Sequence, residues 1–422
     1  MAMGSFHFLH AADIHLDSPL HGLARYDGVP AEEVRGATRA AFDNLIAYAC
    51  DQAVDFVLIA GDLFDGDWKD MGTGLYFARA MGKLAAANIP VYWIAGNHDA
   101  VSSLTRSLPW PDTVHAFKPR RSHTHVIDHL GVAIHGQSFS NAHVTENLAA
   151  AYPEKREHHF NIGLLHTALD GHPGHAPYAP CTVDDLRARH YDYWALGHVH
   201  DFTVVSEWPY IVFSGNLQGR HIRETGPKGA VHVEVEDGAV ARLRHVPLDT
   251  LRWLRVEVDC AAARSMDEVD AATRTALARR HAELSDGRPV VARVVLTGST
   301  PLAGALQERR AERRDAVRAL AAAVAPDLWI EKVQLEVAMP GLSPMGGGPA
   351  EDFMALLAEI RQSPELAAEL KADLLPFLTA AGKAGDFDDD SLAAMAAQDD
   401  WPALLAVAGS ALEARLTGTG GE

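Results

Sequence analysis

Five short polar motifs follow apolar, strand-like runs, and their side chains could together hold metal ions. The motifs read Asp13-Ile14-His15, Gly61-Asp62, Gly96-Asn97-His98-Asp99, His166 and Gly197-His198-Val199-His200. Carboxylate oxygens, an amide oxygen and imidazole nitrogens suit divalent cations such as Mn²⁺, Fe²⁺ or Zn²⁺. A pair of such cations about 3.5–4 Å apart can activate water and clamp a phosphoryl group. The motifs therefore predict hydrolysis of a phosphate ester.

The ligands can be divided between two metal sites that share the carboxylate of Asp62. One site takes Asp13, His15, Asp62 and His200, and the other takes Asp62, Asn97, His166 and His198. Residues two apart on an extended segment point the same way, so we expect Asp13 and His15 to face one ion. His98 directly follows Asn97 and should point elsewhere, which leaves it free to act on the substrate.

Each motif has an ordinary structural explanation when it is taken alone. The chain has 23 histidines, so pairs such as His123 and His125 are expected by chance. A lone histidine after a strand is more often a surface or core residue than a ligand, and Gly-Asp is a common turn. Five such motifs in order, each at the end of a strand, are much harder to explain by packing.

The charge of the chain is unusual for an enzyme that acts on nucleic acid. The net charge is −19 over 422 residues, and residues 351–422 hold fourteen acids against four bases. Phosphate contacts favour basic surfaces, so the charge argues against tight DNA binding without metals. A DNA substrate delivered by a partner protein remains compatible with it.

The composition also bears on the cellular compartment. No apolar run reaches the roughly 18–20 residues that span a bilayer, and Met1–Phe6 lack the features of a signal peptide. Three distant cysteines, Cys50, Cys181 and Cys260, form neither a disulfide framework nor a thiolate zinc site. We expect a cytoplasmic protein with no membrane partner.

Strand-like and helix-like segments alternate over residues 1–250, which predicts a layered α/β domain. The expected strands are 6–12, 56–60, 91–95, 132–135, 161–165, 193–196 and 211–213, with helices at 34–50 and 74–87. The motifs would lie in loops at the carboxyl edge of the sheet, where open α/β sheets place their sites. A hairpin should follow at 231–235 and 239–245.

Three further parts follow this domain. The pattern over residues 251–340 predicts a small α/β capping domain. We expect strands at 253–258, 290–296 and 328–337 and helices at 266–284 and 303–325. Residues 341–350 are a linker by composition, and 351–422 form an acidic helical tail. The tail could bury its apolar stripe on a partner or pack on its own protein, and the sequence favours neither.

The ordered series of motifs resembles the calcineurin-like metallophosphoesterases. The segment His10–Leu20 is similar to the SbcD-type DNA repair exonucleases, most of all to their YhaO-like bacterial branch. The resemblance covers residues 6 to about 250, and the capping domain matches that family in position and size. It implies a Mn²⁺-dependent nuclease acting on DNA, with two metals and with His98 as a general acid contributing on the order of 10²–10⁴-fold. It also implies a coiled-coil ATPase of the SbcC type docked on the tail, and a homodimer.

Some positions depart from this pattern or are less specific. Many nucleases of the family carry histidine three residues after the shared aspartate, where this chain has Asp65. Either Asp65 acts differently or His98 works alone. Four arginines could contact the DNA backbone or could lie on solvated surfaces: Arg220, Arg223, Arg310 and Arg314. Trp68 and Trp110 could stack on bases or serve packing.

Two other functions remain open at this point. The first is a phosphodiesterase for cyclic nucleotides or other small molecules, although such a substrate needs neither a cap nor a tail. The second is a scaffold that recruits an ATPase to DNA ends with a vestigial metal site, although the full ligand set argues against it.

Overall fold

The computed structural model describes residues 4–18, 31–65, 71–101, 110–169, 178–340 and 372–374. Trp68, the linker 341–350 and, apart from 372–374, the tail 351–422 lie outside the described residues, and so does the docking surface expected there. Within these ranges, no helix is long and apolar enough to cross a membrane.

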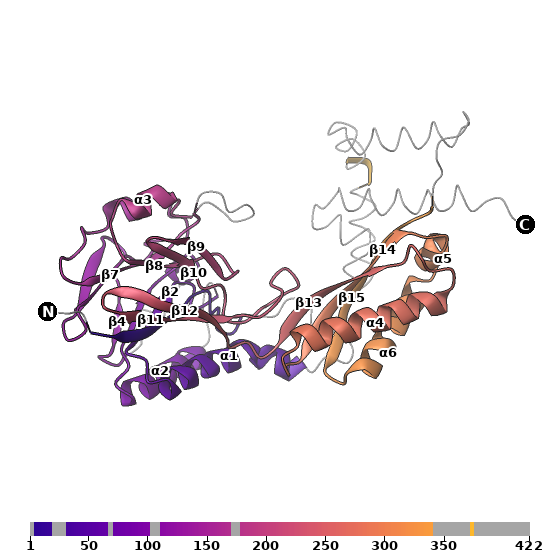
Figure 1. The fold of residues 1–422 in the computed structure, drawn as a ribbon, viewed down its shortest axis with the longest axis horizontal. Coiled ribbons are helices and arrows are strands. Elements are labelled where there is room, and N and C mark those ends of the chain that lie inside the picture. Colours follow the sequence, from indigo (N-terminus) through magenta and orange to yellow (C-terminus); the bar gives the residue numbers. More distant parts are fainter. Residues whose placement is uncertain are drawn as a thin grey trace, which may run out of the picture. The chain divides into compact units, whose positions relative to one another are not determined.

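Two six-stranded sheets form the body of the first unit (Figure 1). The first sheet has the order β12-β11-β1-β2-β3-β4, and the second has the order β5-β6-β7-β8-β10-β9. The strands of the first are β1 (Phe6–Ala11), β2 (Phe56–Ala60), β3 (Val91–Ile94), β4 (Val114–Ala116), β11 (Gly229–Glu236) and β12 (Ala239–Pro247). Those of the second are β5 (His123–Ile127), β6 (Val132–Gly136), β7 (Phe160–His166), β8 (Tyr193–Gly197), β9 (Thr203–Glu207) and β10 (Tyr210–Phe213).

A continuous apolar core joins the facing sides of the two sheets. Phe8 of the first sheet stacks on Phe56 at 5.0 Å between ring centroids and meets Tyr193 of the second sheet edge-on at 5.3 Å. Burial of each such side chain stabilises the fold by roughly 1.5–3 kcal/mol. Two helices, α1 (Ala31–Asp51) and α2 (Met71–Ala86), cover the other face of the first sheet through residues such as Phe42 and Phe77. The expected layered α/β fold is confirmed.

Parallel pairing brings the motif loops to a common edge. Strand β2 pairs in parallel with β1 and β3 in the first sheet, and β7 pairs in parallel with β8 in the second. The carboxyl ends of parallel strands lie together, so the loops after β1, β2 and β3 start side by side. An isolated parallel bridge between Ala12 and Asn216 extends this edge.

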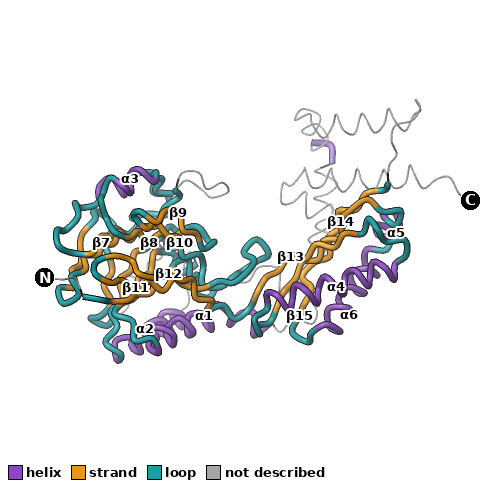
Figure 2. Tube along the Cα trace, in the orientation of Figure 1, coloured by secondary structure: helices purple, strands orange, loops and turns teal. Residues whose placement is uncertain are grey.

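A second part of the fold contains a three-stranded sheet, drawn with its helices in Figure 2. Its elements are β13 (Arg252–Asp259), α4 (Met266–Leu284), β14 (Val290–Ser299), α5 (Ala303–Glu308), α6 (Arg310–Val324) and β15 (Leu328–Ala338). The single helix expected over 303–325 is wrong, because Arg309 leaves helical geometry (φ −110°, ψ 38°) and separates α5 from α6.

The chain divides into two compact units that interleave along the sequence. Met1–Arg255, Arg280–Ala292 and Asp327–Glu331 form the first, and the second comprises Val256–Arg279, Arg293–Pro326 and the chain from Lys332 onward. The first residues of β14 and β15 therefore belong with the first unit, and the rest of both strands belongs with the second. A short helix, α3 (Val183–Arg187), also belongs to the first unit and begins with a capping box at Thr182.

Candidate metal centre

The Asp62 carboxylate lies at the centre of the motif residues and is almost fully buried. Its Oδ1 accepts a hydrogen bond of 2.9 Å from the backbone N–H of His98. Its Oδ2 lies 3.5 Å from Nε2 of His166 and 3.9 Å from Nε2 of His15. One oxygen is therefore anchored by the backbone, and the other faces two imidazoles, one from the loop after β1 and one from the last residue of β7.

Two glycines leave room for this arrangement. A Cβ at Gly61 would lie 2.4 Å from Nδ1 of His166, and a Cβ at Gly96 would lie 2.3 Å from Oδ1 of Asp62. Gly61 also has a φ of +96°, which side chains rarely adopt. The Gly-Asp and Gly-Asn-His-Asp motifs thus need their glycines so that the loops can approach one another closely.

Asp13 and His15 reach the site by a different geometry from the expected one. The expectation of an extended segment is wrong, because β1 ends at Ala11 and both residues have a positive φ, of 48° and 46°. Backbone bonds from Asp13 to Gly61 and from His15 to Asp62 hold this turn in place. Left-handed conformations are unfavourable for such residues and often occur at functional sites.

The remaining ligands surround these carboxylates. Asp13 Oδ1 lies 3.7 Å from Nε2 of His200, and its carboxylate accepts the backbone N–H of His198. The ring of His198 meets that of His166 edge-on at 5.3 Å. His166 Nδ1 donates to the carbonyl oxygen of Ala60, so Nε2 is the ring nitrogen that faces the other candidate ligands.

Asn97 and His166 converge on one position. Oδ1 of Asn97 lies 3.0 Å from Nε2 of His166, the same nitrogen that faces Asp62. An amide oxygen, a carboxylate oxygen and an imidazole nitrogen gathered in this way are suited to a divalent cation.

The pKa values of the metal-free site reflect this crowding. Burial opposes the charge on His166, but the neighbouring Asp62 carboxylate outweighs it and raises the pKa of His166 to about 9. Burial also opposes ionisation of Asp62, but His166, His15 and His98 together hold its pKa well below the usual range. The desolvated ring of His15 has a lowered pKa.

The donor set fits a dinuclear centre. Three groups of potential ligands have their donor atoms within 4.8 Å of one another: Asp13, His15 and His200; His15, Asp62 and His98; and Asp13, Asp62 and His166. His15 is 1% exposed, yet neither of its ring nitrogens makes a hydrogen bond. A buried polar group without a partner is costly, and a cation between these residues would supply the missing one.

Asp65 lies against the histidine that was expected to act on the substrate. Its Oδ1 is 3.0 Å from Nδ1 of His98 and 3.5 Å from Nδ1 of His15, while Ser18 Oγ donates to its Oδ2. The hydrogen bond that His98 donates to Asp65 raises the pKa of His98. His98 therefore does not stand alone. One of its ring nitrogens also lies within 4.8 Å of donor atoms of His15 and Asp62.

Asp99 completes the Gly-Asn-His-Asp motif without facing the site. Its buried carboxylate accepts backbone N–H bonds from Leu63, Phe64 and Gly96. Burial, with the charge of Asp62, raises its pKa to about 7. Asp99 thus ties the loop after β3 to the loop after β2.

A further carboxylate, Glu224, lies beside the site and was missed by the sequence analysis. It is 3% exposed, and its Oε1 accepts a hydrogen bond of 2.7 Å from Nδ1 of His200. Burial opposes its ionisation, but the bond from His200 and the charge of Arg220 hold its pKa well below the usual value. No motif marks it, and only its place a few residues after Ser214-Gly215-Asn216 could have drawn attention to it.

The expected DNA-contacting arginines differ in their surroundings. Arg220 is engaged with Glu224 through its backbone and guanidinium, whereas Arg223 is exposed nearby. On α6, Arg310 bonds Gln307 and Arg314 bonds Asp315. Their neighbour Arg313 is buried and paired with Asp270, so the arginines of this helix do not form one solvent-facing stripe.

Trp110 is a packing residue. Its ring contacts Phe77 at 5.1 Å and Trp93 at 6.1 Å. It joins the core between α2 and the first sheet, and does not stand ready to stack on a base.

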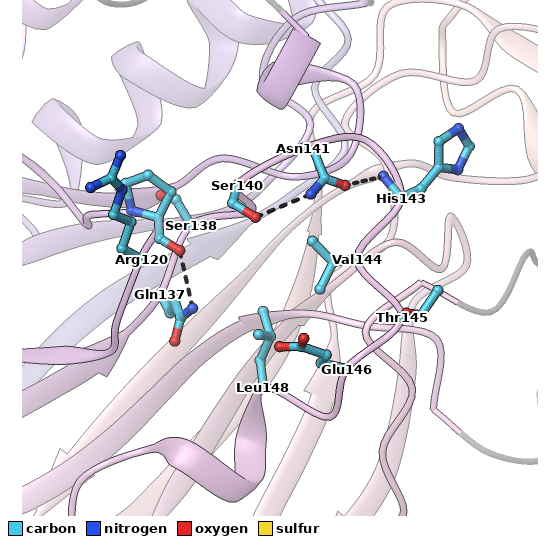
Figure 3. Close-up of a pocket in the computed structure, with 11 residues that line it drawn as sticks. Arg120, Gln137, Ser138, Ser140, Asn141, His143, Val144, Thr145, Glu146 and Leu148 are labelled. Carbon is cyan, nitrogen blue, oxygen red and sulfur yellow. Dashed lines mark hydrogen bonds between the residues drawn. The ribbon is translucent and has the colours of Figure 1, made fainter.

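A pocket of about 430 Å³ lies along the segment that follows β6 (Figure 3). Gln137, Asn141 and His143 line it, and Gln137 Nε2 donates to the carbonyl oxygen of Pro119. Ser138, also in its wall, accepts a bond from the backbone of Ala95, just before the Gly-Asn-His-Asp loop. None of its lining residues is among the expected ligands.

Comparison with known proteins agrees with this fold and donor set. The family described as calcineurin-like phosphoesterase matches residues 6–202, and "Metallophosphoesterase YhaO, middle domain" matches residues 253–338. The chain belongs to the calcineurin-like phosphoesterase family, a family of metal-dependent phosphoester hydrolases that use a dinuclear site of divalent cations.

Two relatives give more detail. The chain is 33% identical over 363 residues to "Uncharacterized metallophosphoesterase YhaO" of Bacillus subtilis, covering 82% of this chain and 86% of that protein. It is 26% identical over 275 residues to "DNA double-strand break repair protein Mre11" of Thermoplasma acidophilum, covering 60% and 68%. Among solved structures, a dimetal phosphatase from Danio rerio is 12% identical with a TM-score of 0.35, over 56% of this chain and 94% of that one.

Proposed function

We propose that this protein is a two-metal phosphodiesterase that hydrolyses DNA phosphodiester bonds, as a Mn²⁺-dependent exonuclease or endonuclease in DNA repair. The observation that carries the chemistry is Asp62 Oδ2, which faces both His15 and His166. A carboxylate that lies between an imidazole from the loop after β1 and an imidazole from the end of β7 is suited to be shared by two cations. The choice of DNA is supported by the relative that is named a DNA double-strand break repair protein.

The side chains divide the work of the proposed reaction. Asp13, His15, Asp62 and His200 would hold one cation, and Asp62, Asn97, His166 and His198 would hold the other. Bound there, the cations supply Lewis acidity at the phosphoryl oxygens and lower the pKa of water. The donors are oxygen and imidazole, with none of the three cysteines among them, and suit Mn²⁺, Fe²⁺ or Zn²⁺. Among these we propose manganese, which the resemblance to the SbcD-type exonucleases implies.

His98 is the proposed proton donor to the leaving oxygen. Its side chain is 41% exposed, so it can meet a substrate, and Asp65 holds its Nδ1. The orientation of the ring then leaves Nε2 to interact with the substrate. Asp65 has a positioning role in this scheme, because it contacts His98 and not the substrate.

Delivery of DNA needs a partner in this proposal, given the net charge of −19. The acidic tail, residues 351–422, would dock a coiled-coil ATPase of the SbcC type in the cytoplasm, and two copies of the chain would form a homodimer. Arg220, Arg223, Arg310 and Arg314 stay proposed contacts to the DNA backbone. A chain shortened at 350 should keep its hydrolytic activity and lose the ATPase.

The experiment that tests this function is digestion of end-labelled duplex DNA with Mn²⁺, with Asp62→Ala as the control. A chromogenic bis-aryl phosphate is assayed in parallel. Degradation of DNA by the intact protein alone supports the nuclease and shows its polarity. Ester hydrolysis without DNA degradation, also in the presence of the ATPase, would instead favour a phosphodiesterase for small molecules. If neither substrate is hydrolysed, the scaffold function gains support.

A further inference from the structure

We propose that Glu224 is a positioning residue that fixes the ring of His200 with Nε2 directed at the metal centre. The inference rests on the proposed ligand role of His200 and deepens the account of that site. It assigns a function to a buried carboxylate that lies outside the five motifs.

The distances around His200 define which nitrogen carries the hydrogen. Nδ1 lies 2.7 Å from Oε1 of Glu224, and Nε2 lies 3.7 Å from Oδ1 of Asp13. Arg220 Nη2 is 3.4 Å from the same Nδ1, much farther than the carboxylate. A carboxylate can only accept, so Nδ1 donates and Nε2 keeps its lone pair for a cation. Such outer partners commonly fix the orientation of metal-binding histidines.

Both carboxylate oxygens of Glu224 accept further hydrogen bonds. Its Oε2 accepts bonds of 2.8 Å from Asn216 Nδ2 and 2.7 Å from the backbone N–H of Arg220. Its Oε1 also accepts a bond of 3.0 Å from the Arg220 guanidinium. A buried charge is costly unless it is paired, and here the arginine offsets the carboxylate. Arg220 therefore serves Glu224 in this structure.

The loop that carries Glu224 is fixed by long-range bonds. Trp253 donates from Nε1 to the carbonyl oxygen of Gly219 and accepts at its own carbonyl oxygen from the backbone of Gly226. Gln218 Nε2 donates to the carbonyl oxygen of Leu251 at 2.7 Å. Because these anchors flank Glu224 on both sides, its carboxylate cannot follow a displaced histidine, and it determines the ring position.

The histidines of the site differ in a way that makes the inference testable. His166 Nδ1 donates to the backbone of Ala60, which no substitution removes. His200 Nδ1 donates to a side chain, which a substitution can remove. Loss of the Glu224 carboxylate should therefore weaken the binding of one cation and leave the affinity for the other unchanged.

The test is a Mn²⁺ titration of the metal-free full chain by calorimetry, on the parent protein, Glu224→Gln, His200→Gln and the double variant. We expect Glu224→Gln to weaken one of two Mn²⁺ sites about 10–100-fold. The double variant should bind within about twofold of His200→Gln, because Glu224 acts through that ring. Unchanged binding in Glu224→Gln, or a loss in the double variant equal to the product of the single losses, overturns the proposal. Unchanged binding in His200→Gln would instead refute the ligand role of His200.

Two further variants keep the result interpretable. Asp249→Asn removes a carboxylate of equal burial that pairs with Arg252 and Arg288 and touches none of the expected ligands, so it should leave both affinities unchanged. Glu224→Asp keeps the charge that faces Arg220 but shortens the reach to Nδ1. If the glutamine variant does not fold, the aspartate variant should show the same selective loss, and unchanged binding there overturns the proposal equally.

Discussion

Oδ1 of Asp65, three residues after Asp62, lies 3.0 Å from Nδ1 of His98. The same carboxylate lies 3.5 Å from His15 and accepts a bond from Ser18. Asp65, in the loop after β2, therefore contacts both the loop after β1 and His98, the proposed general acid. In the proposed reaction, Asp65 would therefore orient the ring of His98.

Replacing Asp65 by asparagine should move the pH profile of hydrolysis. The Asp65 hydrogen bond is the largest cause of the raised pKa of His98, and His98 must be protonated to donate. Activity should fall as pH rises through that pKa, so Asp65→Asn moves the falling limb of kcat/KM to lower pH. The profile is measured with the bis-aryl phosphate. Asp55→Asn, at a partly exposed carboxylate 4.0 Å from His7, is the control. A limb that stays in place in Asp65→Asn would contradict the pairing.

Removing the imidazole of His98 should separate catalysis from metal binding. We expect His98→Ala to keep two Mn²⁺ per chain and to lose about 10²–10⁴-fold in kcat, which is the usual contribution of a general acid. Metal content is measured by elemental analysis and kcat with the same ester. Because His98 also lies near His15 and Asp62, loss of one metal would show that it is a ligand.

Asn97→Ala should lower the affinity of one metal site and leave the affinity of the other unchanged. The Asn97 amide oxygen lies 3.0 Å from Nε2 of His166, and both atoms would contact the same ion. Calorimetric titration with Mn²⁺ should show one weakened site and one that keeps its affinity. Two unchanged sites would contradict the division of ligands between the metals.

Metal affinity should rise with pH. With its pKa raised to about 9 in the metal-free protein, His166 carries a proton at neutral pH and must release it to a cation. The apparent Mn²⁺ affinity should therefore increase between about pH 7 and 9, by up to roughly tenfold per unit for one proton, and level off above pH 9. Titrations in buffers of different ionisation enthalpy count the released protons. No proton release at pH 7.5 would contradict the charged state of His166.

Gly96→Ala should lower both the stability and the metal affinity of the protein, whereas Gly82→Ala should lower neither. The new Cβ would lie 2.3 Å from Oδ1 of Asp62, so we expect a loss of about 1–3 kcal/mol in the free energy of unfolding, with weakened metal binding. Gly82 lies exposed on α2 with nothing within 4 Å of an added Cβ, and Gly82→Ala should stabilise by about 0.5–1 kcal/mol. Urea denaturation of the metal-free proteins measures both, and equal effects would contradict the packing argument.

Elements marked by strong local patterns could be predicted from the sequence. The apolar run of β2 and the helix α4 have the expected bounds, Phe56–Ala60 and Met266–Leu284. Strands β4, β5 and β9 were missed because their residues are largely half-exposed and form no long apolar run, so pairing with neighbouring strands defines them. The break at Arg309 was missed because the sequence on both sides of it favours a helix, so no local pattern marks the end of α5.

The site was predictable in residue types but not in geometry. Motif order placed Asp62, Asn97 and His166 at strand ends, and the fold brings them together. The left-handed turn through Asp13 depends on a tertiary bond to Gly61, which no local pattern reports. Glu224 is one of 56 acidic residues, and its burial against His200 arises only from the packing of distant loops.

Four of the expected ligands, Asp13, His15, Asp62 and His198, have a positive φ, with His198 the farthest from ordinary values at 98°. Such conformations cost of order 1–3 kcal/mol each. Replacing such a ligand by glycine, as in His198→Gly, would relieve the unfavourable backbone conformation and also remove a metal ligand. The metal-free variant should therefore gain free energy of unfolding while its affinity for the cation falls. The backbone at these ligands is therefore least stable by itself in the metal-free protein, and a bound cation would offset that cost by stabilising the native state.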